Sequence, residues 1–261
     1  MRLLLKSIIF LVLSILTQIG GLVYISNDYL IKRAKINRTP LVFLSFIFLY
    51  GLTTFLIVPP LASLFGREKI KNSDRIQPTN YATIILNRNY VVPEINRILK
   101  NSEGYLKTSG LKIKYLDAGF PFLKYFPLLP HLSHHDGRKL DLSLVYSDAH
   151  GNLSNDKKSR SGYGAFEGPS SGENDQISTC LKQGFSQYDY PKYLTFGTVN
   201  THLLFSEDYT KDLITSLLKN KEITKIFIEP HLKNRMMLTD SRIKYHGCRA
   251  VRHDDHIHIQ I

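Results

Sequence analysis

The chain has few cysteines, and no two of them stand at metal-binding spacing. Cys180 and Cys248 are the two thiols among 261 residues, and neither belongs to the CxxC pattern that is typical of a thiolate metal site. Their number is even, and both lie in the second half of the chain. We therefore predict that they form one disulfide if this part of the protein faces an oxidising compartment.

Charged side chains are missing from two long stretches, residues 7–25 and residues 41–65. A helix needs roughly 20 apolar residues to cross the hydrocarbon layer of a bilayer, and neither stretch has a polar face for water. The sequence therefore predicts a membrane anchor of two transmembrane helices over residues 1–65. A cleaved signal peptide is the alternative for the first stretch, because Arg2 and Lys6 precede it, although its apolar run exceeds the roughly 7–15 residues usual there.

Acidic residues are outnumbered by basic ones, 22 to 34, which gives a net charge of +12. Basic residues lie before, between and after the two apolar stretches, so the positive-inside rule leaves open which side of the membrane the remainder faces. The positive excess favours a polyanion or an anionic membrane face as a partner. A solvated lysine-rich surface is the alternative.

The rest of the chain predicts a polar linker over residues 66–80 and one α+β domain over residues 81–261, without an internal repeat. We expect a small antiparallel sheet with flanking helices. Apolar periodicity and cap residues predict strands over residues 83–86, 112–116, 140–146, 223–228 and 256–261, and helices over residues 93–99 and 207–218.

Residues 147–178 are rich in Gly, Ser, Asn and Asp. Such a composition cannot bury enough apolar surface to organise itself. Because the segment directly follows the strand predicted over residues 140–146, we expect a surface loop that lies partly beside the active site and is less ordered than the sheet.

Histidines and aspartates gather in two short clusters, residues 133–141 and residues 253–258. The period of a strand places His256 and His258 on the same side of the last predicted strand. A catalytic zinc ion needs three imidazole or carboxylate ligands and one open position, which Asp141 and one histidine from each cluster can supply. A solvated surface of His and Asp is the alternative.

The first cluster fits the pattern HxxGxxxD with His134, Gly137 and Asp141, and the second fits HxxHxH with His253, His256 and His258. Together they resemble the motifs of the penicillin-insensitive murein endopeptidases, members of the D-alanyl-D-alanine metallopeptidase superfamily. The resemblance covers roughly residues 110–261 and is specific at these two motifs.

The resemblance implies a role for each motif residue. The zinc ligands would be His134, Asp141 and His258. His253 stands where some relatives have a glutamate, so it would act as the general base, with Asp254 or Asp255 as the alternatives. His256 would lie beside the zinc and hold the water or the developing oxyanion.

The sequence therefore predicts a membrane-anchored Zn²⁺ metallopeptidase that hydrolyses D-alanyl peptide bonds of peptidoglycan. Its catalytic domain would lie outside the cytoplasmic membrane, in the periplasm, and no nucleic acid partner is expected. A catalytically idle zinc-binding scaffold of the cell wall is the main alternative. A metal-dependent nuclease using His134, Asp136 and Asp141 is a weaker one, because it leaves the terminal histidine motif without a role.

Overall fold

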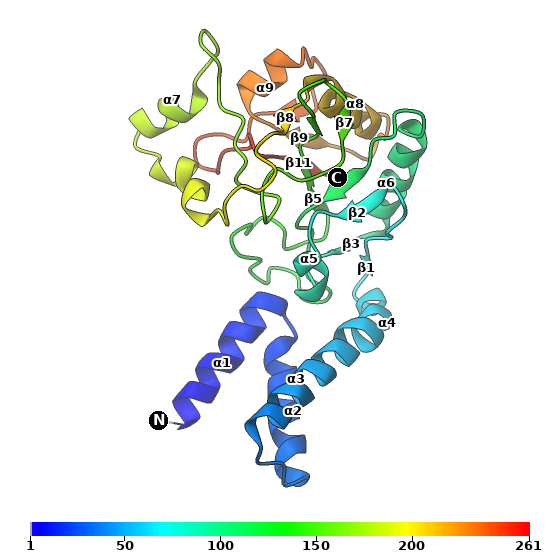
Figure 1. Cartoon of the computed structure of the whole chain (residues 1–261), viewed down its shortest axis with the longest axis vertical. Coiled ribbons are helices and arrows are strands. Elements are labelled where there is room, and N and C mark those ends of the chain that lie inside the picture. The colour runs from blue at the N-terminus through cyan, green and yellow to red at the C-terminus, as the bar shows by residue number, and fades with distance from the viewer. Residues whose placement is uncertain (1) are drawn as a thin grey trace. The chain divides into compact units, whose positions relative to one another are not determined.

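The computed structural model describes residues 2–261, which form helices and short strands (Figure 1). The chain folds into two compact units. The described residues of the first unit are 2–70, 81–93 and 117–138, and those of the second are 71–80, 94–116 and 139–261. The fold is mixed α+β, as predicted.

The first unit contains the N-terminal helices. Its elements are α1 (Arg2–Thr17), α2 (Gly20–Arg33), α3 (Thr39–Leu52), a π-helix (Thr53–Ile57), α4 (Val58–Leu64), β1 (Glu68–Lys69), α5 (Ala82–Ile85) and β3 (Tyr90–Val91). β1 and β3 pair antiparallel. A small apolar core joins Ile19, Val23, Val58, Ala62 and Tyr90.

One helix of residues 2–261 is long and apolar enough to cross a membrane. It is the continuous run Thr39–Leu64, which combines α3, the π-helix and α4 over 26 residues. At 1.5 Å per residue this length is about 39 Å, more than the roughly 30 Å of a bilayer core. Pro59 and Pro60 fall in the first turn of α4, directly after the wider π turn that precedes them.

The prediction of a second spanning helix was wrong. The first apolar stretch is divided between α1 and α2, because Gln18 takes a φ of 66° and ends the first helix. α1 covers only about 24 Å. α2 then folds back along α1, where a side chain at Gly21 would collide with the first helix. An ion pair of 2.6 Å joins Lys6 to Asp28, so the two helices form an antiparallel hairpin.

The second unit is built on a sheet of six strands in the order β10-β9-β11-β5-β4-β2. These strands are β2 (Ile76–Pro78), β4 (Ile113–Tyr115), β5 (Lys139–Ser143), β9 (Lys225–Phe227), β10 (Ile243–Lys244) and β11 (His256–Gln260). β11 pairs antiparallel with β5 and β9, whereas β10 pairs parallel with β9 and β2 parallel with β4. The predicted antiparallel sheet is therefore a mixed one, and β2 comes from the segment assigned to the linker.

Helices and a smaller sheet complete the second unit. They are α6 (Pro93–Tyr105), α7 (Gln176–Lys182), a 3₁₀ helix (Ser186–Leu194), α8 (Glu207–Leu218) and α9 (Pro230–Arg235), with β6 (Tyr146–Ser147), β7 (Leu153–Ser154) and β8 (Leu204–Phe205) in a three-stranded sheet. α6 and α8 form as predicted, and the Ser206 side chain caps α8 by accepting a hydrogen bond from the backbone of Tyr209. Residues 83–86, predicted as a strand, lie mostly in the short helix α5.

Cys180 and Cys248 form the predicted disulfide, with their Cα atoms 5.2 Å apart. The bond fastens α7 to the segment that follows β10. It therefore restrains both the end of the segment 147–178 and the chain that leads into the terminal histidine motif.

Candidate metal centre

Asp141 and His258 face each other across the centre of the six-stranded sheet. They are register partners in the antiparallel pair of β5 and β11, and His258 Nδ1 lies 2.8 Å from Asp141 Oδ1. Both side chains are buried. The pairing of β5 with β11 therefore brings together the two side chains that the sequence suggested as ligands of one metal ion, and the alternation of each strand accounts for their common face.

The other carboxylate oxygen of Asp141 also has polar neighbours. Tyr163 donates its hydroxyl to Asp141 Oδ2 over 2.8 Å, and His256 Nε2 lies 3.9 Å from the same oxygen. Tyr163 belongs to the segment 147–178, so the prediction that this segment lies beside the site is confirmed. Its mobility relative to the sheet stays a prediction.

His131 and His134 are brought together by a turn just before β5. The backbone N–H of His134 donates to the carbonyl of His131 over 3.0 Å, and the two rings lie 5.6 Å apart. His134 Nδ1 lies 2.7 Å from the carbonyl oxygen of Ala118. Because a carbonyl oxygen only accepts, Nδ1 carries the proton and Nε2 is the atom that can bind a metal ion.

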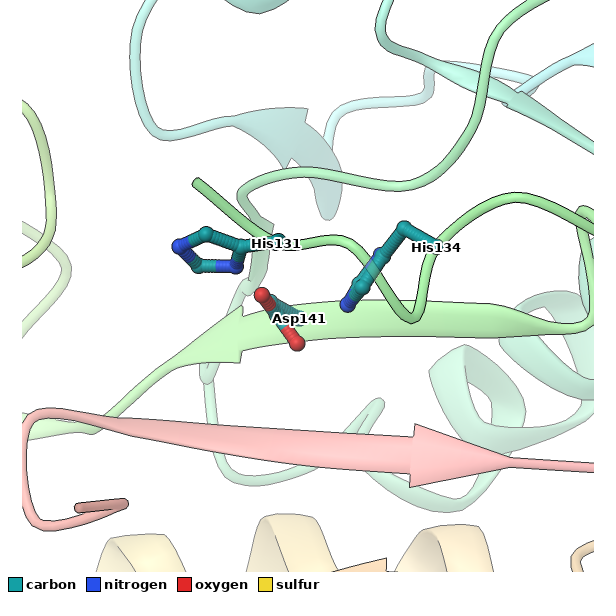
Figure 2. A group of neighbouring side chains, drawn as sticks. All are labelled: His131, His134 and Asp141. Carbon is teal, nitrogen blue, oxygen red and sulfur yellow. The ribbon is translucent and has the colours of Figure 1, made fainter. Parts of the chain in front are cut away.

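Within the short segment 131–141, the side chains of His131, His134 and Asp141 form a group that can hold a metal ion (Figure 2). Their ligand atoms lie within 4.8 Å of one another. Two ligand atoms of a tetrahedral zinc ion are about 3.4 Å apart, so the side chains must move somewhat closer to bind one.

This group contains two of the three predicted ligands, His134 and Asp141, together with His131, which lies outside both histidine clusters of the sequence. His258, the third predicted ligand, contacts the Asp141 carboxylate directly. His258 thus has the position of either a further ligand or a partner that orients the carboxylate. One sequence feature could have indicated the turn that joins His131 to His134. The two histidines are three residues apart, just before the predicted strand.

His256 is held in the charged form by the carboxylates around it. Its Nδ1 lies 2.5 Å from Asp255 Oδ1, and the backbone of Gly164 donates to Asp255 Oδ2 over 2.6 Å. Burial opposes the charge, but the charges of Asp255 and Asp141 outweigh it and raise the pKa of His256 to about 9. Both carboxylate oxygens of Asp255 therefore have partners, one of them the His256 ring.

His253 lies in a cluster of rings and is kept neutral. Its ring stacks on that of His246, with centroids 5.4 Å apart and 9° between the planes, and its edge faces His258 at 5.8 Å. Burial, followed by the charges of His256 and His258, holds the pKa of His253 well below its ordinary value. A neutral imidazole can accept a proton, which is the property that a general base requires.

Two buried carboxyl groups support the backbone around His253. Glu229 accepts hydrogen bonds from the backbone N–H of His253 (2.8 Å) and from the hydroxyl of Tyr188 (2.5 Å). Arg252 donates to both oxygens of Asp254, over 2.7 Å and 2.5 Å. Asp254 is thus paired with a cation. Both alternatives to His253 as the general base, Asp254 and Asp255, therefore already have charged partners.

Gly137 of the first motif is required by the packing of a buried arginine. It adopts a φ of 69°, and a Cβ built on it would lie 1.9 Å from Arg67 Nη1. Arg67 is 2% exposed and donates to the carbonyl of His135 over 3.4 Å. Its guanidinium therefore packs against the chain just after His134, in the space that a side chain at position 137 would need.

We expect Gly137→Ala to distort this segment and to lower the affinity for zinc by roughly tenfold or more. The added methyl group must displace a buried guanidinium, and overpacking of this kind costs about 1–3 kcal/mol; the left-handed backbone adds a further penalty. Zinc titration and thermal unfolding of the full chain would measure both effects. Gly104→Ala in α6 is the control, because no atom lies within 4 Å of its added Cβ. Equal zinc affinity in both variants would contradict the role given to Gly137.

Comparison with known proteins found no relative that could assign a function to this site. No protein-family model and no curated protein matches the sequence. The arrangement of side chains, rather than a relative, therefore has to support any function.

Proposed function

We propose that the chain is a zinc metallopeptidase, anchored in the cytoplasmic membrane, that hydrolyses D-alanyl peptide bonds of peptidoglycan. One observation carries the proposal. The candidate ligand Asp141 contacts His258 across the β5–β11 pair, and the neutral His253 lies beside His258. A hydrolase needs this combination of a metal-ligating group and an adjacent proton acceptor.

The donor set suits zinc. Imidazole nitrogen and carboxylate oxygen are common zinc ligands, and three protein ligands leave the fourth position for water or substrate. His134 and Asp141 would hold the ion, with His131 or His258 as the third ligand. Bound zinc polarises a peptide carbonyl and acidifies water.

Two histidines of the terminal motif would handle protons and charge. His253 would accept the proton of the attacking water, since its buried ring is kept neutral. His256 would place a positive charge next to the substrate carbonyl, where negative charge develops in the transition state. Asp255 would maintain that charge through its 2.5 Å contact with His256 Nδ1.

The substrate class rests on the resemblance of the two motifs to those of murein endopeptidases. Three features support a location at the cell wall. Thr39–Leu64 can anchor the chain in the membrane, the Cys180–Cys248 disulfide suits an oxidising compartment such as the periplasm, and the net charge of +12 suits an anionic wall.

Metal removal tests the proposal. We expect the full chain, purified in detergent, to contain about one zinc ion and to cleave a cross-linked D-alanyl muropeptide. A chelator should abolish cleavage, and added zinc should restore it. Elemental analysis and chromatography of the products would measure both. Cleavage that persists after complete zinc removal would contradict the proposal, and zinc binding without cleavage would favour the idle scaffold.

A further inference from the structure

A polar pocket separate from the candidate metal group lies in the second unit, around the end of β5. Its volume is about 170 Å³, and its lining includes Lys112, Lys114 and Lys157 together with Thr79 and Ser143. Pockets that enclose whole drug-sized ligands are larger, roughly 300–1,000 Å³. This one is therefore the size of a single functional group rather than of a complete ligand.

The pocket carries an excess of positive charge. Among its lining residues are one acidic residue, Asp156, and three lysines. Lys114 donates to the side-chain oxygen of Gln77, and Lys157 to the backbone carbonyl of Arg160, each over 2.8 Å. Both acceptors are neutral, so these bonds orient the lysines without offsetting their charge.

Lys112 adds a third cation with an available donor group. Within residues 2–261 its ammonium group makes no hydrogen bond or ion pair. Burial, followed by the charge of Lys112, lowers the pKa of Lys114, so the two cations disfavour each other in the absence of an anion.

Thr79 supplies a neutral hydrogen-bonding group at the same place. Its hydroxyl oxygen is buried and has no hydrogen-bond partner in the part of the chain that the structure describes. A buried hydroxyl without a partner is costly, so a rotation of the Thr79 side chain that let it donate to an anion in the pocket would be favourable.

We propose that this pocket is a subsite for an anionic group, a carboxylate or a phosphate, held by Lys112, Lys114 and Lys157. Ser143 lies two residues beyond Asp141 in β5, which corresponds to about 7 Å along the strand and to the same side of it. A carboxylate of the peptide substrate could therefore occupy the subsite while its scissile bond lies at the metal centre. That use of the pocket rests on the proposed peptidase function.

Binding of inorganic phosphate tests the subsite without any reaction. Calorimetric titration of the full, metal-depleted chain at constant ionic strength should show one site. Lys112→Met and Lys157→Met should each weaken it by roughly tenfold or more, since each removes a charge-assisted hydrogen bond. Lys221→Met is the control, because Lys221 is exposed and lies outside the pocket. Equal affinity in all four proteins, or no saturable binding, would overturn the subsite.

Pairs of muropeptides with a free or an amidated side carboxylate identify the source of the anion. If the substrate supplies it, the parent should show a KM at least about tenfold lower for the free acid, and Lys112→Met should lose that preference while keeping its kcat. If the parent binds phosphate but shows no preference for the free-acid muropeptide, the subsite holds a separate phosphate. That result would support the subsite and reject the idea that the substrate's carboxylate occupies it. Phosphate binding in a protein that cuts no peptide would retain the subsite and reject the peptidase.

Discussion

His253→Ala is expected to retain about one zinc ion per chain but to cleave D-alanyl peptides roughly 10²–10⁴-fold more slowly than the parent. His253 is not among the candidate ligands, so its loss should leave the metal in place. Its neutral ring lies against His256 and His258, and both alternative bases are paired with other side chains. Metal content and turnover must be measured on the same preparation.

Two further variants make this result interpretable. His253→Asn keeps most of the buried volume and controls for a cavity left by alanine, whereas His202→Ala removes an exposed histidine elsewhere and should cleave like the parent. If His253→Ala and His253→Asn both cleave at the parent's rate, the base lies elsewhere.

Asp141→Asn is expected to have the largest effect on the metal, lowering zinc affinity by more than about 100-fold and abolishing cleavage. Substitution of a residue that only orients a ligand lowers metal affinity roughly 10–100-fold. A larger loss of affinity therefore indicates that the substituted residue is itself a ligand. Asp141 is completely buried and contacts His258 and Tyr163. Zinc titration with a competing chelator would measure the change.

Asp136→Asn is the matched control for this substitution. Asp136 lies on the same segment but accepts a hydrogen bond from the backbone of Arg138, and its variant should bind zinc like the parent. The same titration on His131→Ala and His258→Ala assigns the third ligand, because that residue alone should exceed the roughly 10–100-fold range of an outer partner. Retained zinc binding in Asp141→Asn would reject the candidate centre.

The positions of the main strands could be predicted because their side chains alternate. Strict alternation over residues 256–261 and residues 140–146 led to β11 and β5, and hence to the common face of Asp141 and His258. The exact register could not be predicted, because it depends on the pairing of strands that lie far apart along the chain. A short apolar run such as residues 83–86 fits a strand and a helix equally well, and here it forms the helix α5.

Other features depend on tertiary contacts that the sequence does not encode locally. Apolar content predicted a helix through residues 7–25, but one left-handed residue, Gln18, divides it. His131 joins the candidate metal group through a turn after a proline-rich segment, and His246 stacks on His253 within the irregular connection between β10 and β11. Neither histidine lies in a recognisable motif, so only the folded chain reveals them.

Digestion of purified cell-wall sacculi by the zinc-loaded full chain tests the central claim most directly. Mass spectrometry of the soluble products should reveal peptides released by cleavage at D-alanyl bonds, and none should appear with Asp141→Asn or His253→Ala. Intact sacculi after incubation with protein that carries one zinc ion per chain would contradict the proposed peptidase.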